Sequence, residues 1–188
     1  MELSGLFKRS KHKDQAHRLY LSVVEQARKP AFYRHYGVPD TLDGRFEMIL
    51  VHAVLLLRRL RDEGEAGTEL GQVTFDVMID DLDQSLREMG VGDLGVGRRV
   101  KSMAKAYFGR TEAYEAGLAA SDDDELIAAL ERNLFGTVAV EAPCVTVMAG
   151  YMRDLSRRLE GQSGTDLLAG SVDFGEAPKN DVGDPGDE

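Results

Sequence analysis

Hydrophobic residues recur at spacings of three and four along most of the chain, which is the pattern of helices that bury one face. The strongest stretch follows Thr41, whose hydroxyl is placed to cap a helix, and its apolar positions fall on more than one side. We therefore expect this helix to be central. Similar patterns predict helices over about 14–29, 42–60, 70–89, 94–108, 111–120, 121–134 and 143–159.

No segment alternates apolar and polar residues as a half-buried strand does. The predicted fold is therefore all-α, a single compact helical bundle of about seven helices. A length of 188 residues, 43% of them hydrophobic, is enough for one domain with a substantial core.

Composition divides this chain into three parts. Residues 1–13 form a basic N-terminal segment, residues 14–160 the helical domain, and residues 161–188 an acidic tail. The tail is rich in Gly, Asp, Pro and Ser and has few large apolar residues to offset its ordering entropy. We expect it to be disordered, at least from Val172.

The formal net charge of −10 should repel nucleic acid and anionic lipid from the molecule as a whole. The charge is arranged in blocks: residues 61–89 carry two basic and nine acidic side chains, whereas residues 90–110 carry five basic and one acidic. Any anionic partner must therefore be met locally, and a general DNA-binding role is excluded.

Cys144 is the single cysteine, so no internal disulfide can form, and the first residues lack the pattern of a secretory signal. The longest apolar stretch, residues 48–57, is far shorter than the roughly 20 residues of a membrane span. These features predict a soluble protein of the reducing cytoplasm.

Three carboxylates, Asp76, Asp80 and Asp83, fall on one stripe of a predicted helix. Such a stripe could hold Mg²⁺ for a phosphorylated or isoprenoid lipid, which would make the chain a small all-α enzyme or lipid binder. The other interpretation is a solvated or partner-facing acidic surface. The sequence favours this second interpretation, because no second acidic site is evident on a facing helix.

Residues 90–95 have the pattern G-x-G-x-x-G, but a predicted helix precedes them where the dinucleotide fold needs a strand. We interpret the glycines as a helix stop and a flexible corner. The basic residues that follow could attract an anion, although a solvated helix face is the simpler explanation. They are Arg98, Arg99, Lys101 and Lys105.

His52 lies in the most apolar predicted helix, where a hydrogen-bonded core histidine is more common than a catalytic one. No nucleophile, base and orienting residue can be assembled from the sequence, and no histidine has ligand spacing with Cys or Glu. We expect no catalytic residues, no metal site and no cofactor.

The N-terminal segment places two apolar residues before a basic cluster, which is a weak pattern of anchoring at a membrane surface. A frayed basic tail is an equal alternative. The residues are Leu6, Phe7, Lys8, Arg9, Lys11 and Lys13.

Several short motifs resemble, in their order and spacing, the ubiquinol-cytochrome c chaperone family. They lie at 26–33, 36–46, 51–60, 75–83, 87–94, 107–110, 113–118 and 126–135. The family-motif residues that we single out are Tyr36, Gly37, His52, Tyr114, Gly117, Leu118, Arg132 and Asn133.

This resemblance implies an assembly chaperone for respiratory complex III that binds newly made cytochrome b and has no enzymatic activity. It leaves association with the ribosome open. The chain has no tryptophan and has Glu131 where mitochondrial members commonly carry one, which fits a bacterial member. We expect the acidic stripe at Asp76, Asp80 and Asp83 to meet basic client loops, with the protein at the cytoplasmic face of the inner membrane.

Overall fold

The computed structural model describes residues 3–178, with side chains from His12 onward. Every regular element in this part of the chain is a helix, so the predicted all-α bundle is confirmed. Hydrophobic spacing does not predict the two shortest helices, since five or six residues are too few to show a period. The helices are α1 (Leu3–Ala27), α2 (Pro30–His35), α3 (Leu42–Arg61), α4 (Gly64–Glu88), α5 (Asp93–Ala119), α6 (Asp124–Asn133), α7 (Ala142–Glu160) and α8 (Gly164–Leu168).

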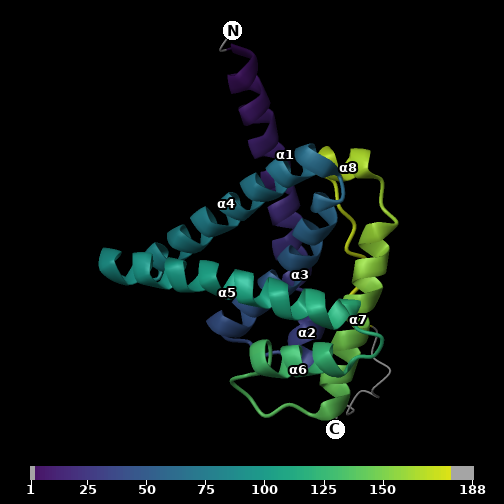
Figure 1. Cartoon of the computed structure of the whole chain (residues 1–188). Helices are drawn as coiled ribbons and strands as arrows, with labels where there is room; N and C mark the ends of the chain where they lie inside the picture. Colours follow the sequence, from purple (N-terminus) through teal and green to yellow (C-terminus); the bar gives the residue numbers. More distant parts are fainter. Residues whose placement is uncertain (1–2, 179–188) are drawn as a thin grey trace.

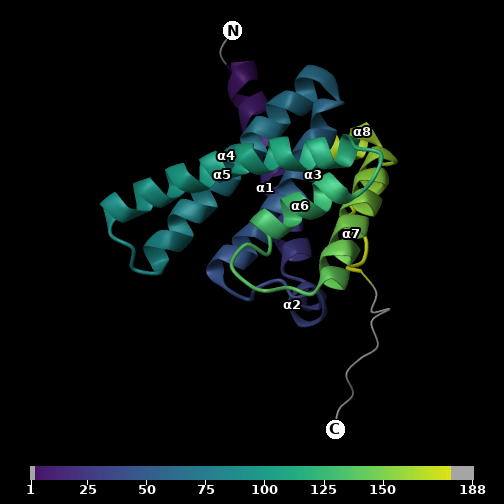
Figure 2. The same cartoon turned by 60° about the horizontal axis from the view of Figure 1, so that its bottom comes forward.

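Helix α3 is the centre of the bundle (Figures 1 and 2). The Thr41 side chain accepts a hydrogen bond from the Gly44 backbone N–H at 3.1 Å, which is the predicted cap. Every residue from Phe46 to Leu57 is buried. This burial on all sides follows from its contacts with α1, α4, α5, α7 and α8.

Helices α4 and α5 form a long hairpin that projects from the body as an arm in both views (Figures 1 and 2). Gly90, with φ of +80°, ends α4 as predicted. Residues 90–92 join α4 to α5 and residues 93–95 are the first residues of α5, so the glycine pattern follows a helix and not a strand. At the tip, Asp93 accepts a hydrogen bond from Arg87 at 2.5 Å.

The prediction of two helices over 94–108 and 111–120 is wrong, because α5 is continuous through both ranges. The Thr111 hydroxyl donates to the Tyr107 carbonyl at 2.9 Å, so this side chain bonds back into the same helix and does not start a new one. Gly109 interrupts the apolar pattern without breaking the helical backbone.

The C-terminal region is ordered further than predicted. Residues 161–178 are part of the described structure, and Leu167 of α8 is fully buried. Residues 170–178, which we call the C-terminal strap, then lie against α1 and α3. The ring of Phe174 is buried and lies 5.5 Å from the ring of His52. Residues 179–188 lie outside the described part of the chain.

Polar contacts hold the C-terminal strap where apolar residues are few. Arg158 forms an ion pair with Asp173 at 2.6 Å, and Lys29 donates to the Gly175 carbonyl at 2.8 Å. The Tyr36 hydroxyl donates to the carbonyl of Pro178 at 3.0 Å. Lys29 and Tyr36 flank α2 and Arg158 belongs to α7, so the strap's own composition does not predict these partners.

None of the helices within residues 3–178 has both the length and the apolar character that crossing a bilayer requires.

Candidate functional site

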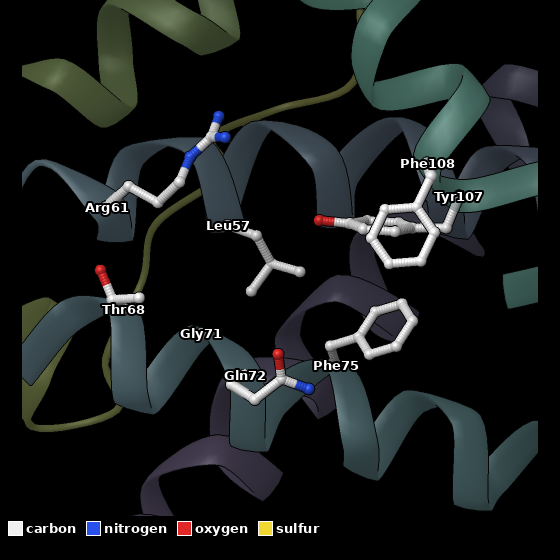
Figure 3. A pocket seen from close by; sticks show the side chains of 8 residues that line it. All are labelled: Leu57, Arg61, Thr68, Gly71, Gln72, Phe75, Tyr107 and Phe108. Atoms are coloured by element: carbon white, nitrogen blue, oxygen red, sulfur yellow. The ribbon is translucent and has the colours of Figure 1, made fainter. Parts of the chain in front are cut away.

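A groove opens where α3, α4 and α5 meet at the base of the arm, with a volume of about 190 Å³ (Figure 3). Three aromatic rings gather at one end, and Arg61 and Thr68 lie at the other. Eight residues line it: Leu57, Arg61, Thr68, Gly71, Gln72, Phe75, Tyr107 and Phe108.

The aromatic end of the groove is held by contacts among its own rings. Phe75 of α4 lies 4.8 Å from Tyr107 and 5.9 Å from Phe108 between ring centroids, and the two α5 rings lie 5.3 Å apart. Such edge and tilted contacts favour aromatic packing. Phe108 nevertheless remains 63% exposed, so the groove offers an apolar surface to solvent.

Polar residues bound this groove on two sides. Arg61 and Glu115 form an ion pair at the α3 end. Gln72 donates to the Asp76 carboxylate at 2.9 Å, so one member of the predicted acidic stripe lies directly beside the groove. Burial raises the pKa of Tyr107, which therefore stays protonated.

The predicted acidic stripe is divided between exposed and paired carboxylates. Asp76 and Asp80 are exposed, while Asp83 is half-buried and pairs with Arg87 at 2.5 Å. The neighbouring Asp81 accepts a hydrogen bond from the Tyr20 hydroxyl at 2.7 Å. Within the described residues no three His, Cys, Asp or Glu side chains gather closely enough to hold a metal ion. The Mg²⁺ hypothesis therefore gains no support from the geometry.

The predicted basic cluster lies on α5 within the arm. Arg98, Arg99, Lys101 and Lys105 are all exposed. Arg99 borders a hollow that also contains the Glu47–Arg110 ion pair at 2.6 Å. Burial raises the pKa of Glu47, whereas its hydrogen bond to Arg110 acts in the opposite direction.

His52 is fully buried in a chain of hydrogen bonds, as predicted for a core histidine. Its Nδ1 lies 2.8 Å from the Met48 carbonyl, which can only accept, so Nδ1 carries the proton. Nε2 then accepts from the Tyr151 hydroxyl at 2.7 Å, and that oxygen accepts from Gln26 at 2.9 Å. Burial lowers the pKa of His52 to about 4, so it is neutral at physiological pH.

Two further family-motif residues, Gly117 and Leu118, hold α5 against neighbouring helices. A Cβ at Gly117 would lie 2.7 Å from Leu126 Cα, so only glycine lets α6 pack this closely. Arg153 of α7 donates to the carbonyls of Gly117 and Leu118 at 3.0 and 3.2 Å. Tyr114, one turn earlier, is fully buried in the core.

The remaining motif residues lie at the ends of helices. Tyr36 is buried and ends α2, and Gly37 follows it with φ of +67°, a conformation that favours glycine. Arg132 is exposed and lies with Asn133 in the last turn of α6.

Of the predicted membrane-proximal residues, Leu6, Phe7, Lys8, Arg9 and Lys11 have side chains outside the described set. Lys13 is exposed. The backbone from residue 3 is helical and continuous with the rest of α1.

Sequence reasoning did not identify the groove as a site. Leu57 is one apolar position of the predicted central helix, and Phe75, Tyr107 and Phe108 enter only through the motifs at 75–83 and 107–110. One signal was available in the sequence. Aromatic residues make up only 7% of the chain, so the adjacent pair Tyr107 and Phe108 stands out.

Fold and surface together define an all-helical protein with an open aromatic groove beside an acidic rim. A model of the ubiquinol-cytochrome C chaperone family matches residues 34–174, and the chain belongs to this family.

The chain is similar to ubiquinol-cytochrome c reductase complex assembly factor 1 of Mus musculus, with 29% identity over 170 residues, 89% of this chain and 57% of the relative. It matches the Xenopus laevis assembly factor 1 at 29% identity, over 89% of this chain and 84% of that protein. It thus spans just over half the length of the mouse relative. The crystal structure of the Cbp3 homolog from Brucella abortus matches with 35% identity and a TM-score of 0.80, covering 94% of this chain and 97% of that one.

Proposed function

We propose that this chain binds newly made cytochrome b and supports assembly of the ubiquinol-cytochrome c reductase complex. The observation that carries the proposal is the family match over residues 34–174, since these residues include most of the core and the whole groove. The assembly-factor relatives extend this support to 89% of the chain. An open apolar groove is the type of surface by which a chaperone shields an apolar client.

Deleting the gene tests this proposal. We expect lower cytochrome b absorbance and lower ubiquinol-cytochrome c reductase activity, both restored by the complete chain. A tagged chain should co-purify cytochrome b from the same cells. Normal complex levels in the deletion strain, or no cytochrome b with the tagged chain, would contradict the proposal.

The acidic stripe is proposed to meet the basic cytoplasmic loops of the client. Asp76 and Asp80 suit this role better than Asp83, whose carboxylate is paired with Arg87. Changing Asp76 and Asp80 to Lys should reduce recovery of cytochrome b while leaving the circular dichroism spectrum unchanged. Exposed Glu25 and Glu131, changed to Lys, supply a control with the same net charge; equal recovery from both variants would reject the role.

The basic segment 1–13 is proposed to hold the chain at the cytoplasmic face of the inner membrane. Deleting these residues should move the protein from the membrane fraction to the soluble fraction. An unchanged distribution would show that the segment is not an anchor.

A further inference from the structure

The length of the groove matches two turns of a helix, whose side chains could enter it. Along α4 it extends from Thr68 to Phe75, which corresponds to about 10 Å or two helical turns. A partner helix would present apolar side chains at positions i, i+3 or i+4, and i+7 over that length.

The aromatic surface is already assembled before any partner binds. Contacts among Phe75, Tyr107 and Phe108 hold the three rings together, while Phe108 remains 63% exposed. Rigid aromatic side chains lose little conformational entropy on binding and commonly supply most of the affinity at an interface.

The charges beside the groove select a basic partner. Asp76 and Asp80 are exposed along the α4 rim, and the described residues give neither of them a basic partner. On α5, Glu112 lies one turn after Phe108 and Lys105 lies one turn before it. One is negative and the other positive, so together they add no net charge on this side of the groove. The pair of Arg61 and Glu115 is neutral as a unit, which leaves the α4 rim acidic.

We infer that this groove binds an apolar helix that carries Lys or Arg beside its apolar face, as found at the cytoplasmic end of a membrane-spanning helix. The inference rests on the proposed function, since that function supplies a membrane protein as the client. It adds the location and the chemistry of the contact: aromatic side chains take the apolar face, and the α4 rim takes the basic residues.

Fluorescence anisotropy with a labelled helical peptide tests the inference. The peptide has about 18 residues, with Leu and Phe at the spacing above and two Lys beside them; its counterpart carries Glu in place of Lys. We expect the Lys peptide to bind at least about tenfold more tightly than the Glu peptide. Phe108→Ala in the full chain should weaken binding by about tenfold, since this exposed ring contributes contact area and little to the core.

Leu94→Ala is the matched control, because Leu94 is 90% exposed on the same helix at the arm tip. It should leave peptide affinity unchanged. Equal affinity for both peptides, or equal loss from both variants, would overturn the inference. So would a chain that forms dimers which Phe108→Ala converts to monomers, since a second copy would then occupy the groove.

Recovery of cytochrome b separates this inference from the proposed function. If the unaltered chain co-purifies cytochrome b and Phe108→Ala does so equally well, the groove assignment fails and the function stands. If the unaltered chain recovers none, the proposed function fails.

Discussion

Gln26, Tyr151 and His52 form a directed chain of hydrogen bonds that ends at the Met48 carbonyl. Each donor in this chain has an acceptor, so these three side chains are buried with their polar groups paired. Phe32 and Phe174 lie against the imidazole at 5.7 and 5.5 Å. Burial opposes a positive charge at His52, and Lys29 adds repulsion, so protonating this side chain opposes folding.

Stability should therefore fall as the pH drops from about 6.5 towards 4. In this window the unfolded chain binds a proton at His52 and the folded chain, with a pKa of about 4, does not. Between pH 7 and pH 5 this one group should cost about 2 kcal/mol of unfolding free energy. Urea unfolding at both pH values measures the loss. His52→Gln should show a smaller decrease; an equal decrease would mean that other groups cause it.

Gly117→Ala should destabilise the protein by more than about 2 kcal/mol, because the added methyl would meet the backbone of α6. Gly109→Ala lies on the same helix with nothing within 4 Å of the added carbon. That change should stabilise by about 0.5–1 kcal/mol through helix propensity. Thermal unfolding of the two variants makes the comparison, and similar shifts would refute the packing argument.

Single residues were predictable from the sequence where one helix sets their environment. His52 sits among apolar residues on every side of its own helix, which is enough to predict a core position. The groove was not predictable in this way, since Phe75 and Phe108 become neighbours only through the angle at which α4 crosses α5. The exposure of Phe108 likewise depends on how α3 packs against α4 and α5, which the sequence of α5 does not determine.

At the level of elements, the long helices follow from hydrophobic spacing, whereas the short helices α2 and α8, the continuity of α5 and the order of the C-terminal strap do not. Helix α5 continues through Gly109 because a single glycine costs only about 1 kcal/mol in a helix, less than its packing on α4 and α6 provides. The C-terminal strap is ordered because partners distant in sequence hold it, as Lys29 holds Gly175.

Phe174→Ala should destabilise the protein by about 3 kcal/mol, since it removes the buried ring through which the C-terminal strap contacts the core. Val172→Ala is the control within the same segment; its side chain is only half-buried, and the cost should be about 1 kcal/mol or less. Denaturant unfolding tests both. Equal small effects would show that the polar contacts alone hold the strap.

The whole molecule combines a solid body with a projecting arm (Figures 1 and 2). Helix α3 is enclosed by other helices, whereas the C-terminal end of α4 and the N-terminal end of α5 project together from the body. Backbone hydrogen bonds near the arm tip should therefore open at lower free energy than those at the centre.

Hydrogen exchange followed by mass spectrometry tests this difference. Peptides from residues 85–100 should exchange faster than peptides from residues 48–57 by at least about a hundredfold. Uniform exchange across both regions would mean that the arm and the body unfold together. In that case the arm would not be an independently mobile element.

The contact between α1 and the C-terminal region also sets an order of events during protein synthesis. Arg18 donates to the Ala169 carbonyl across 151 positions of sequence. At 5–20 residues per second, a ribosome needs roughly 8–30 s to add the residues between these two partners. Throughout that interval α1 exists before the C-terminal residues that later cover it. A nascent chain stalled before residue 169 therefore keeps the region around Arg18 accessible to other proteins.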